Sequence, residues 1–292
     1  EMKLVRYGAP GAERPGIWLD ATKTEPARIV DVRGMVFDVE DYDARFWRTF
    51  GVERLKALLQ EPNLKTISAA GVRLGPPIAP PRQIICLGKN FRDHAKEFDA
   101  KVPEFPVYFS KSPGSLCGPA DPIRLKPGME RVDAEAELAV VVGKRASGIH
   151  EGEALSYVAG YAVLNDVTNR DLQKARLQWF FAKSADSFGP MGPWLVTRDE
   201  IKRPHALGIR QRVNGEILQE SKTSQMIFRI DMVLADLSRV LTLEPGDLIS
   251  MGTPGGIGSA RMPPVVLHDG DVVECEIDGI GTLRNPVVLA YG

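Results

Sequence analysis

The sequence predicts an α+β protein, mainly β, in which a small N-terminal α/β domain precedes a larger β-rich domain. Three observations support this prediction. Residues 1–74 combine short strand-like stretches with a helical pattern. The proline-rich stretch at 75–81 can neither continue a helix nor lie in a central strand. Residues 82–292 consist mostly of apolar runs separated by turn signals. We therefore predict two domains joined by a linker at 75–81.

In the N-terminal region, the stretches GIWLD and RIVDV predict strands because β-branched and aromatic residues dominate them. A helical pattern follows in DARFWRTFGVERLKALLQ. There the apolar side chains recur near helical spacing, at Phe46, Phe50, Leu55, Leu58 and Leu59. We expect these side chains to form the buried face of a helix.

In the C-terminal region, Asn214-Gly215 predicts a tight hairpin, since this pair suits the two positive φ angles of the favoured turn. Asp278-Gly279 is a second candidate turn. The apolar stretches YVAGYAVLND and DLISMGT predict further strands. One helix, roughly from Asn169 to Phe181, is expected to interrupt them.

Composition narrows the functional classes. The 292 residues carry a formal net charge of −1, which gives no reason to expect nucleic acid or an anionic membrane as a partner. No apolar run approaches the roughly 18 residues of a membrane span, and the first residues lack the pattern of a secretory signal. Three widely spaced cysteines do not form a disulfide framework. We therefore expect a cytoplasmic protein.

Two glutamates inside an apolar strand are the most informative feature. In DAEAELAVVVGK, residues 133–144, Glu135 and Glu137 are two apart and so share one face of a strand. An edge strand with solvated glutamates is one interpretation, but the valines that follow favour a strand entering the core. A third acid, Asp166, ends another apolar strand. Three carboxylates without a cysteine or histidine cluster suit Mg²⁺ or Mn²⁺.

These segments resemble the fumarylacetoacetate hydrolase family over residues 82–290. The resemblance implies that Glu135, Glu137 and Asp166 hold the metal, that the C-terminal domain is a roll of mixed β-sheets, and that the chain forms homodimers through it. The N-terminal MKLVRYG is similar to the bacterial branch of 2,4-diketo-3-deoxy-L-rhamnonate and L-fuconate hydrolases. The matching stretches are IICLGKNFRDHAKE, DAEAELAVVVGK, GYAVLNDVTNRDLQ, FAKSADSFGPMGPWLVT and LEPGDLISMGTPGGIG.

The resemblance also implies a water-activating pair, His94 and Glu97, which lie on one face if their segment is helical. Without the resemblance, a surface His–Glu pair is the simpler interpretation. The charged segment 89–105 is predicted to order over the substrate, because excluding water protects an enolate.

Further site residues follow from the same motifs. Arg170 and Gln173 match donors to substrate oxygens, although a solvated first helical turn would look the same. Lys183 follows bulky apolar residues, so its side chain either extends to solvent or meets an anion in a pocket. The resemblance favours the pocket. The glycine-rich MGTPGGIG lacks the helix and lysine of a P-loop, but Thr253 within it offers a hydroxyl to a carboxylate.

The chain departs from the family pattern at three positions. Phe91 replaces a tyrosine, and Lys89 is a lysine that family members commonly lack. Ala182 replaces the glycine that usually precedes the lysine of the motif, here Lys183. None of these positions is an expected metal ligand. The departures therefore bear on substrate identity rather than on the class of reaction.

We expect metal-dependent hydrolysis of a carbon–carbon bond in a 2,4-dioxo acid, with His94 activating water and Lys183 and Arg170 stabilising the departing pyruvate enolate. Three alternatives remain open. Decarboxylation or isomerisation of oxaloacetate-like acids would use the same metal site. Dehydration of 3-deoxy-2-oxo sugar acids would share its chelation. A catalytically inactive binding protein would lack metal affinity.

Overall fold

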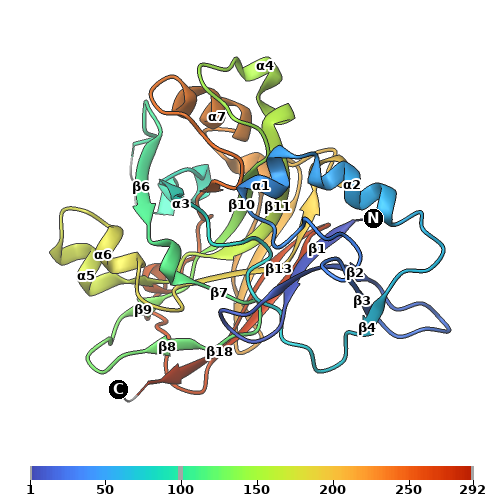
Figure 1. The fold of residues 1–292 in the computed structure, drawn as a ribbon. Helices are drawn as coiled ribbons and strands as arrows, with labels where there is room; N and C mark the ends of the chain where they lie inside the picture. Colours follow the sequence, from blue (N-terminus) through green and yellow to red (C-terminus); the bar gives the residue numbers. More distant parts are fainter. Residues whose placement is uncertain (1, 98–100, 291–292) are drawn as a thin grey trace.

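The computed structural model describes residues 2–97 and 101–290, and its framework is a pair of packed β-sheets with short helices around them (Figure 1). The larger sheet has the strand order β4-β3-β2-β1-β13-β11-β10-β16-β5-β6, and β7 pairs with β13. Its strands are β1 (Lys3–Tyr7), β2 (Arg14–Leu19), β3 (Arg28–Asp31), β4 (Thr66–Ser68), β5 (Ile84–Gly88), β6 (Val107–Lys111), β7 (Leu116–Cys117), β10 (Ala136–Val142), β11 (Val158–Asn165), β13 (Gly189–Thr197) and β16 (Leu248–Ser250).

The second sheet has the order β15-β14-β17-β18-β8, and β9 pairs with β12 separately. Most neighbours are antiparallel, but β16 runs parallel to β5, β13 to β7 and β18 to β8. The predicted fold, mainly β with mixed sheets, is confirmed. These strands are β8 (Ile123–Leu125), β9 (Val132–Asp133), β12 (Thr168–Asn169), β14 (Gly208–Val213), β15 (Glu216–Lys222), β17 (Val272–Ile277) and β18 (Gly281–Leu289).

Strand β10 lies between two apolar cores. Leu138, Val140 and Val142 face the core between the sheets, whereas Ala139 and Val141 face the core under the N-terminal helices. A strand covered on both faces needs a continuous apolar run, which accounts for the valines after Glu137. Glu137 therefore lies near the start of a strand that cannot move without disturbing both cores.

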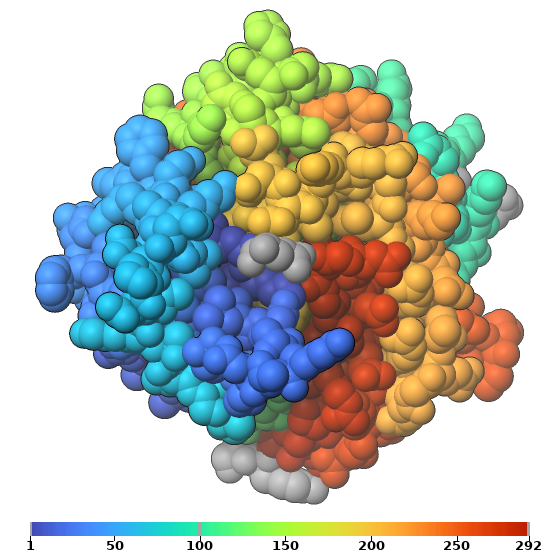
Figure 2. Space-filling view, turned by 90° about the vertical axis from the view of Figure 1, so that its right-hand side faces the viewer, coloured from blue at the N-terminus to red at the C-terminus, as the bar shows by residue number. Residues whose placement is uncertain are grey.

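The N-terminal region continues the large sheet, because β1 pairs with β13. Helices α1 (Ala44–Arg48) and α2 (Gly51–Leu58) cover the outer face of that sheet. Within the proline-rich stretch, Ile78 is buried in the same core. Figure 2 shows N-terminal residues (blue) beside the C-terminal residues (red). The two sheets are also joined by a hydrogen bond from Trp194 of β13 to the Ile280 carbonyl, between β17 and β18 (2.6 Å). The division at 75–81 stays a prediction.

The structure corrects the predicted helix around Phe50. The chain breaks between α1 and α2, where Phe50 adopts a left-handed conformation (φ 56°) and its side chain is 72% exposed. The break brings Gly51 so close to the Phe46 ring that a Cβ at Gly51 would lie 2.3 Å from it. Phe50 therefore does not belong to the buried face, because this contact overrides the local periodicity.

The helix predicted from Asn169 to Phe181 is also two helices, α5 (Arg170–Ala175) and α6 (Phe180–Lys183). Arg176 is extended between them (φ −116°, ψ 147°). The break turns the Trp179 indole edge-on against Phe109, with the ring centroids 5.2 Å apart. A long-range aromatic contact thus decides where the helix ends.

The two predicted hairpins are confirmed. Asn214 (φ 52°) and Gly215 (φ 82°) join β14 to β15, and Asp278 to Ile280 join β17 to β18. The remaining helices are short, and no helix in the described ranges is long and apolar enough to span a membrane. They are α3 (Arg92–Glu97), α4 (Glu151–Ala154) and α7 (Ile230–Ser238).

Candidate active site

The structure brings together the three carboxylates predicted as metal ligands. Glu135 and Glu137 lie at the start of β10, and Asp166 follows the end of the neighbouring strand β11. Because the strands are antiparallel and Ala136 pairs with Asn165, the end of β11 meets the start of β10. One oxygen from each carboxylate lies within 4.8 Å of the others, and all three residues are buried.

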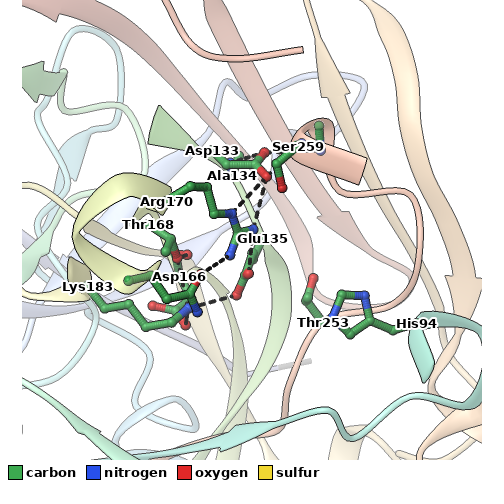
Figure 3. Close-up of polar contacts among 12 residues, drawn as sticks. His94, Asp133, Ala134, Glu135, Asp166, Thr168, Arg170, Lys183, Thr253 and Ser259 are labelled. Atoms are coloured by element: carbon green, nitrogen blue, oxygen red, sulfur yellow. Dashed lines mark hydrogen bonds and ion pairs between the residues drawn. The ribbon is translucent and has the colours of Figure 1, made fainter. Parts of the chain in front are cut away.

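Lys183 bridges two of these carboxylates. Its ammonium donates to Glu135 Oε2 (3.0 Å), Asp166 Oδ2 (2.6 Å) and Thr168 Oγ1 (2.8 Å), as Figure 3 shows. Burial disfavours its charge, but Asp166 and Glu135 outweigh burial and raise the pKa of Lys183. Burial likewise opposes ionisation of Glu135, but Lys183 and Arg170 lower its pKa to about 2. The lysine therefore lies in a pocket, where its carboxylate partners favour the charged form.

Glu137 is held by neutral hydrogen-bond donors in the described structure. Its Oε2 accepts hydrogen bonds from the Ser250 hydroxyl and from the Gly252 backbone N–H (3.0 Å). Burial, followed by the charges of Asp166 and Glu135, raises the pKa of Glu137 well above its usual value. Among the described residues, Glu137 is the one of the three carboxylates that makes no ion pair, although the charge of Lys183 partly opposes the rise of its pKa.

Lys111, at the end of β6, is a second buried cation in this site. It is fully buried, donates to Asp166 Oδ1 (2.9 Å) and also bonds the backbone carbonyl of Lys183. The two lysines therefore each hold one oxygen of Asp166. This arrangement fixes the carboxylate from both sides.

Arg170 connects the carboxylates to the glycine-rich loop. Its guanidinium donates to Glu135 Oε1 (2.7 Å), to Asp133 Oδ2 (3.0 and 3.1 Å) and to Gln173 Oε1 (2.9 Å). Asp133 is buried and also accepts from the backbone N–H groups of Gly258 (3.1 Å) and Ser259 (3.0 Å). Arg170 is thereby oriented by two carboxylates.

We call seven of these residues the carboxylate cluster: Asp133, Glu135, Glu137, Asp166, Lys111, Arg170 and Lys183. The carboxylates of the cluster outnumber its cations by one. When all these groups are ionised, the cluster has one excess negative charge. In the protein alone, the raised pKa of Glu137 removes this charge by favouring the neutral carboxyl. A divalent cation at the three hard oxygen ligands would relieve it equally well and leave an excess positive charge for an anionic substrate. The donor set fits Mg²⁺ or Mn²⁺.

A cavity of about 540 Å³ opens onto the cluster. Gln173 and Thr253, predicted to contact the substrate, both line it. The Thr253 hydroxyl, however, donates to the Ala136 carbonyl (2.9 Å) and accepts from Gln219 Nε2 (2.8 Å). Its proton therefore supports the start of β10 rather than pointing to a substrate carboxylate.

His94 and Glu97 lie on α3, in the predicted one-face arrangement. His94 Nδ1 is 3.4 Å from Glu97 Oε2, and Glu97 Oε1 accepts from the Gly256 N–H (2.9 Å). His94 lines the cavity, and Figure 3 shows it beside Thr253, apart from Lys183 and Asp166. The pair therefore belongs to the cavity wall. Of the segment predicted to close, residues 98–100 lie outside the described residues.

Residues 83–288 match the C-terminal domain of fumarylacetoacetate (FAA) hydrolase. The chain belongs to the fumarylacetoacetate hydrolase family. A mitochondrial oxaloacetate tautomerase of Xenopus laevis is 41% identical over 98% of this chain and 90% of that protein. These matches confirm the predicted family and show that the chain is an enzyme of this family. They do not point specifically to the L-rhamnonate and L-fuconate branch.

Two solved structures extend the comparison with the family. A fumarylacetoacetate hydrolase from Exiguobacterium antarcticum is 37% identical, with a TM-score of 0.83 over 99% of this chain and all of that one. A maleylpyruvate hydrolase from Sphingobium sp. SYK-6, in complex with manganese(II) and pyruvate, is 29% identical, with a TM-score of 0.81 over the same shares. Family members thus include both hydrolases and isomerising enzymes, and at least one binds a divalent metal.

Two residues of the carboxylate cluster, Asp133 and Lys111, were not predicted as site residues from the sequence. Asp133 carried a usable signal, because it precedes Glu135 and Glu137 at the same spacing of two and so continues their row. Lys111 carried a weaker one, as a lysine ending the strand-like stretch VYFSK. Its burial depends on β6 lying beside β5 at the edge of the sheet, which no local pattern encodes.

Proposed function

We propose that this chain catalyses metal-dependent keto–enol interconversion of a 2-oxo acid, with oxaloacetate as the first substrate to test. The observation that carries the proposal is the carboxylate cluster at the floor of the cavity, where Lys183 and Arg170 are held as cations beside three converging carboxylates. An enolate develops negative charge on an oxygen, and preorganised cations stabilise such charge strongly. The tautomerase relative supports this choice of reaction.

The chain's own residues then have separate tasks. Arg170, oriented by Asp133 and Glu135, would bind the substrate carboxylate. Lys183 would donate a hydrogen bond to the developing enolate oxygen, and its raised pKa keeps it protonated while it does so. His94, on the cavity wall, would move one proton between C3 and the 2-oxo oxygen, assisted by Glu97. No net proton is gained or lost, as tautomerisation requires.

Glu135, Glu137 and Asp166 would hold Mg²⁺ or Mn²⁺. When bound, the cation would supply Lewis-acid polarisation of the 2-oxo group and lower the cost of enolate charge. The backbone N–H of Gly252 and the hydroxyl of Ser250 would keep Glu137 in place for this purpose.

Hydrolytic cleavage of a 2,4-dioxo acid is the second candidate. The His94–Glu97 pair favours it, because a histidine backed by a carboxylate can activate water as well as move a proton from carbon. The products would be pyruvate and a second carboxylic acid, and 2,4-diketo-3-deoxy-L-rhamnonate and L-fuconate are the substrates to test.

We further propose that the enzyme works as a cytoplasmic homodimer, which sedimentation and cell fractionation would check.

One substrate panel separates these reactions. The purified chain is assayed with Mg²⁺ or Mn²⁺ for loss of the enol absorbance of oxaloacetate, for release of pyruvate from 2,4-dioxo acids, and for release of CO₂. We expect enol loss to be accelerated and to stop with a chelator. Pyruvate release from a dioxo acid without accelerated enol loss would favour the hydrolase, and inactivity in every assay would refute both.

A further inference from the structure

We propose that Lys89 is a specificity-determining residue that binds the second carboxylate of a dicarboxylic 2-oxo acid at the mouth of the cavity. This inference rests on the proposed function, since it assumes that the first carboxylate and the 2-oxo group bind at the carboxylate cluster. Lys89 lines the same cavity as Glu135 and Lys183. It is exposed, whereas those two are buried, so it lies where the cavity opens to solvent.

The backbone of Lys89 is strained in a way that fixes its position. It has a φ of 54°, a left-handed conformation that side chains with a Cβ rarely adopt. Outliers of this kind persist only where the surroundings enforce them, and they gather at ligand-binding sites. Asparagine or glycine would meet the same backbone need at lower cost. A lysine here is therefore a choice that folding alone does not explain.

The neighbouring Asn90 enforces this conformation. Asn90 is fully buried, and its amide donates to the carbonyls of Phe228 (3.0 Å) and Met251 (2.8 Å) and accepts from the Phe228 N–H (2.8 Å). Its own carbonyl accepts from the Ile227 N–H (2.7 Å). These bonds tie the end of β5 to two other segments, so Lys89 cannot relax by moving its backbone.

The charges around the mouth are predominantly positive. Lys174 and Arg131 line the cavity together with Lys89. Arg131 lies 3.7 Å from Asp171, but among the contacts of the described residues neither Lys89 nor Lys174 has an ion-pair partner. Phe109 and Trp179 form an apolar wall of the cavity: the Phe109 ring centroid lies 5.1 Å from Lys183 Nζ, and Trp179 packs against Gly88, the residue before Lys89. A substrate with an acid group at each end and a short apolar middle matches this order of surfaces.

The test compares two ligands with the same carbon chain. Binding of 2-oxoglutarate and of its 5-(N,N-dimethyl)amide, which keeps the first carboxylate but is uncharged at the second and cannot cyclise to a lactam, is measured by calorimetry with Mg²⁺ present. We expect the wild type to prefer the diacid by about five-fold, the upper range for a solvent-accessible ion pair. Lys89→Asn tolerates the left-handed backbone but lacks the charge, and should remove the preference without weakening the amide. Lys89→Arg should keep it, as should the surface control Lys202→Asn.

Thermal unfolding separates function from fold. Because Lys89→Asn relieves the backbone strain, its melting temperature should equal or exceed that of the wild type while its selectivity is lost. An equal affinity of the wild type for the two ligands, or a preference retained in Lys89→Asn, would overturn the role of Lys89. If pyruvate binds with Mg²⁺ in either of those cases, the proposed function survives. If neither pyruvate nor the two test acids bind, both proposals fail.

Discussion

The carboxylate cluster and the His94–Glu97 pair face one cavity but are built in different ways. The cluster stands on the ends of β10 and β11, inside the large sheet, and Lys111 and Asp166 within it have no exposed side-chain surface. The pair stands on α3, a helix of six residues, with side chains 14% and 22% exposed. Its atoms lie 3.4 Å apart, a long separation for a hydrogen bond.

The difference separates two requirements of the proposed reaction. Stabilising an enolate needs charges that do not reorganise, and buried sheet ends provide them. Moving a proton needs a base that can approach and withdraw from carbon, and a short helix at the edge of the fold permits this. We therefore expect damage to the cluster to affect metal binding and stability, and damage to the pair to affect rate alone.

The largest effect is expected from Glu137→Gln, which keeps the shape of the side chain but removes a metal ligand. Lewis-acid assistance is worth several kcal/mol, so activity should fall by about 10⁴-fold. Mg²⁺ should also lose most of its ability to raise the melting temperature. Glu216→Gln, on the exposed hairpin, is the matched control. A wild-type response to Mg²⁺ would show that Glu137 does not bind the metal.

Lys111→Met tests whether the buried region is held together by its charges. The change leaves Asp166 with Lys183 as its remaining lysine partner. Breaking a buried ion pair commonly costs 3–5 kcal/mol, and we expect about 3 kcal/mol of lost unfolding free energy because that second lysine remains. Urea denaturation measures this loss. Lys126→Met, at an exposed pair, should cost less than about 1 kcal/mol, and an equal loss in both variants would contradict the comparison.

His94→Ala tests the other region. Loss of a general base should lower the rate by about 10²-fold, the lower end of the usual range. Melting temperature and Mg²⁺ affinity should stay close to wild-type values, because His94 stands on α3 in the cavity wall, whereas the expected metal ligands lie at the ends of β10 and β11. Glu97→Gln should do less damage, since an amide oxygen can still accept from Gly256. Full activity in His94→Ala would return the pair to an ordinary surface role.

The smallest effect concerns His205, which lies outside both regions and provides a baseline for pH studies of His94. Its Nε2 accepts from the Ile230 N–H at the start of α7 (3.1 Å), and burial lowers its pKa below the usual 6.5. The neutral ring is therefore favoured by folding, so stability should be complete above pH 6.5 and decline as pH falls below it. Denaturation from pH 8 to 5 should show a decline smaller than about 1 kcal/mol that is absent in His205→Gln. A decline retained in the variant would assign it to other groups.

The sequence predicted the features that depend on local chemistry. Asn214-Gly215 indicated its hairpin because few residue pairs accept two positive φ angles. Glu135 and Glu137 indicated a shared face because the strand repeat is two, and the third ligand followed from an acid at the end of an apolar strand. The ordered motifs indicated the family, which the comparisons confirmed.

Tertiary structure decided what depends on distant contacts. The break at Arg176 accompanies the packing of Trp179 on Phe109, a contact between distant segments, whereas the break at Phe50 accompanies a nearer contact, that of Gly51 with the Phe46 ring. The burial of Lys111 depends on its strand lying at the sheet edge beside Asp166. Local spacing fixes which face a side chain occupies, but the charges that surround it come from other segments of the chain, here α5, α6 and β6. For this reason the three carboxylates, together with Arg170 and Lys183, could be assigned to one site from the sequence motifs, whereas the buried partner Lys111 required the fold.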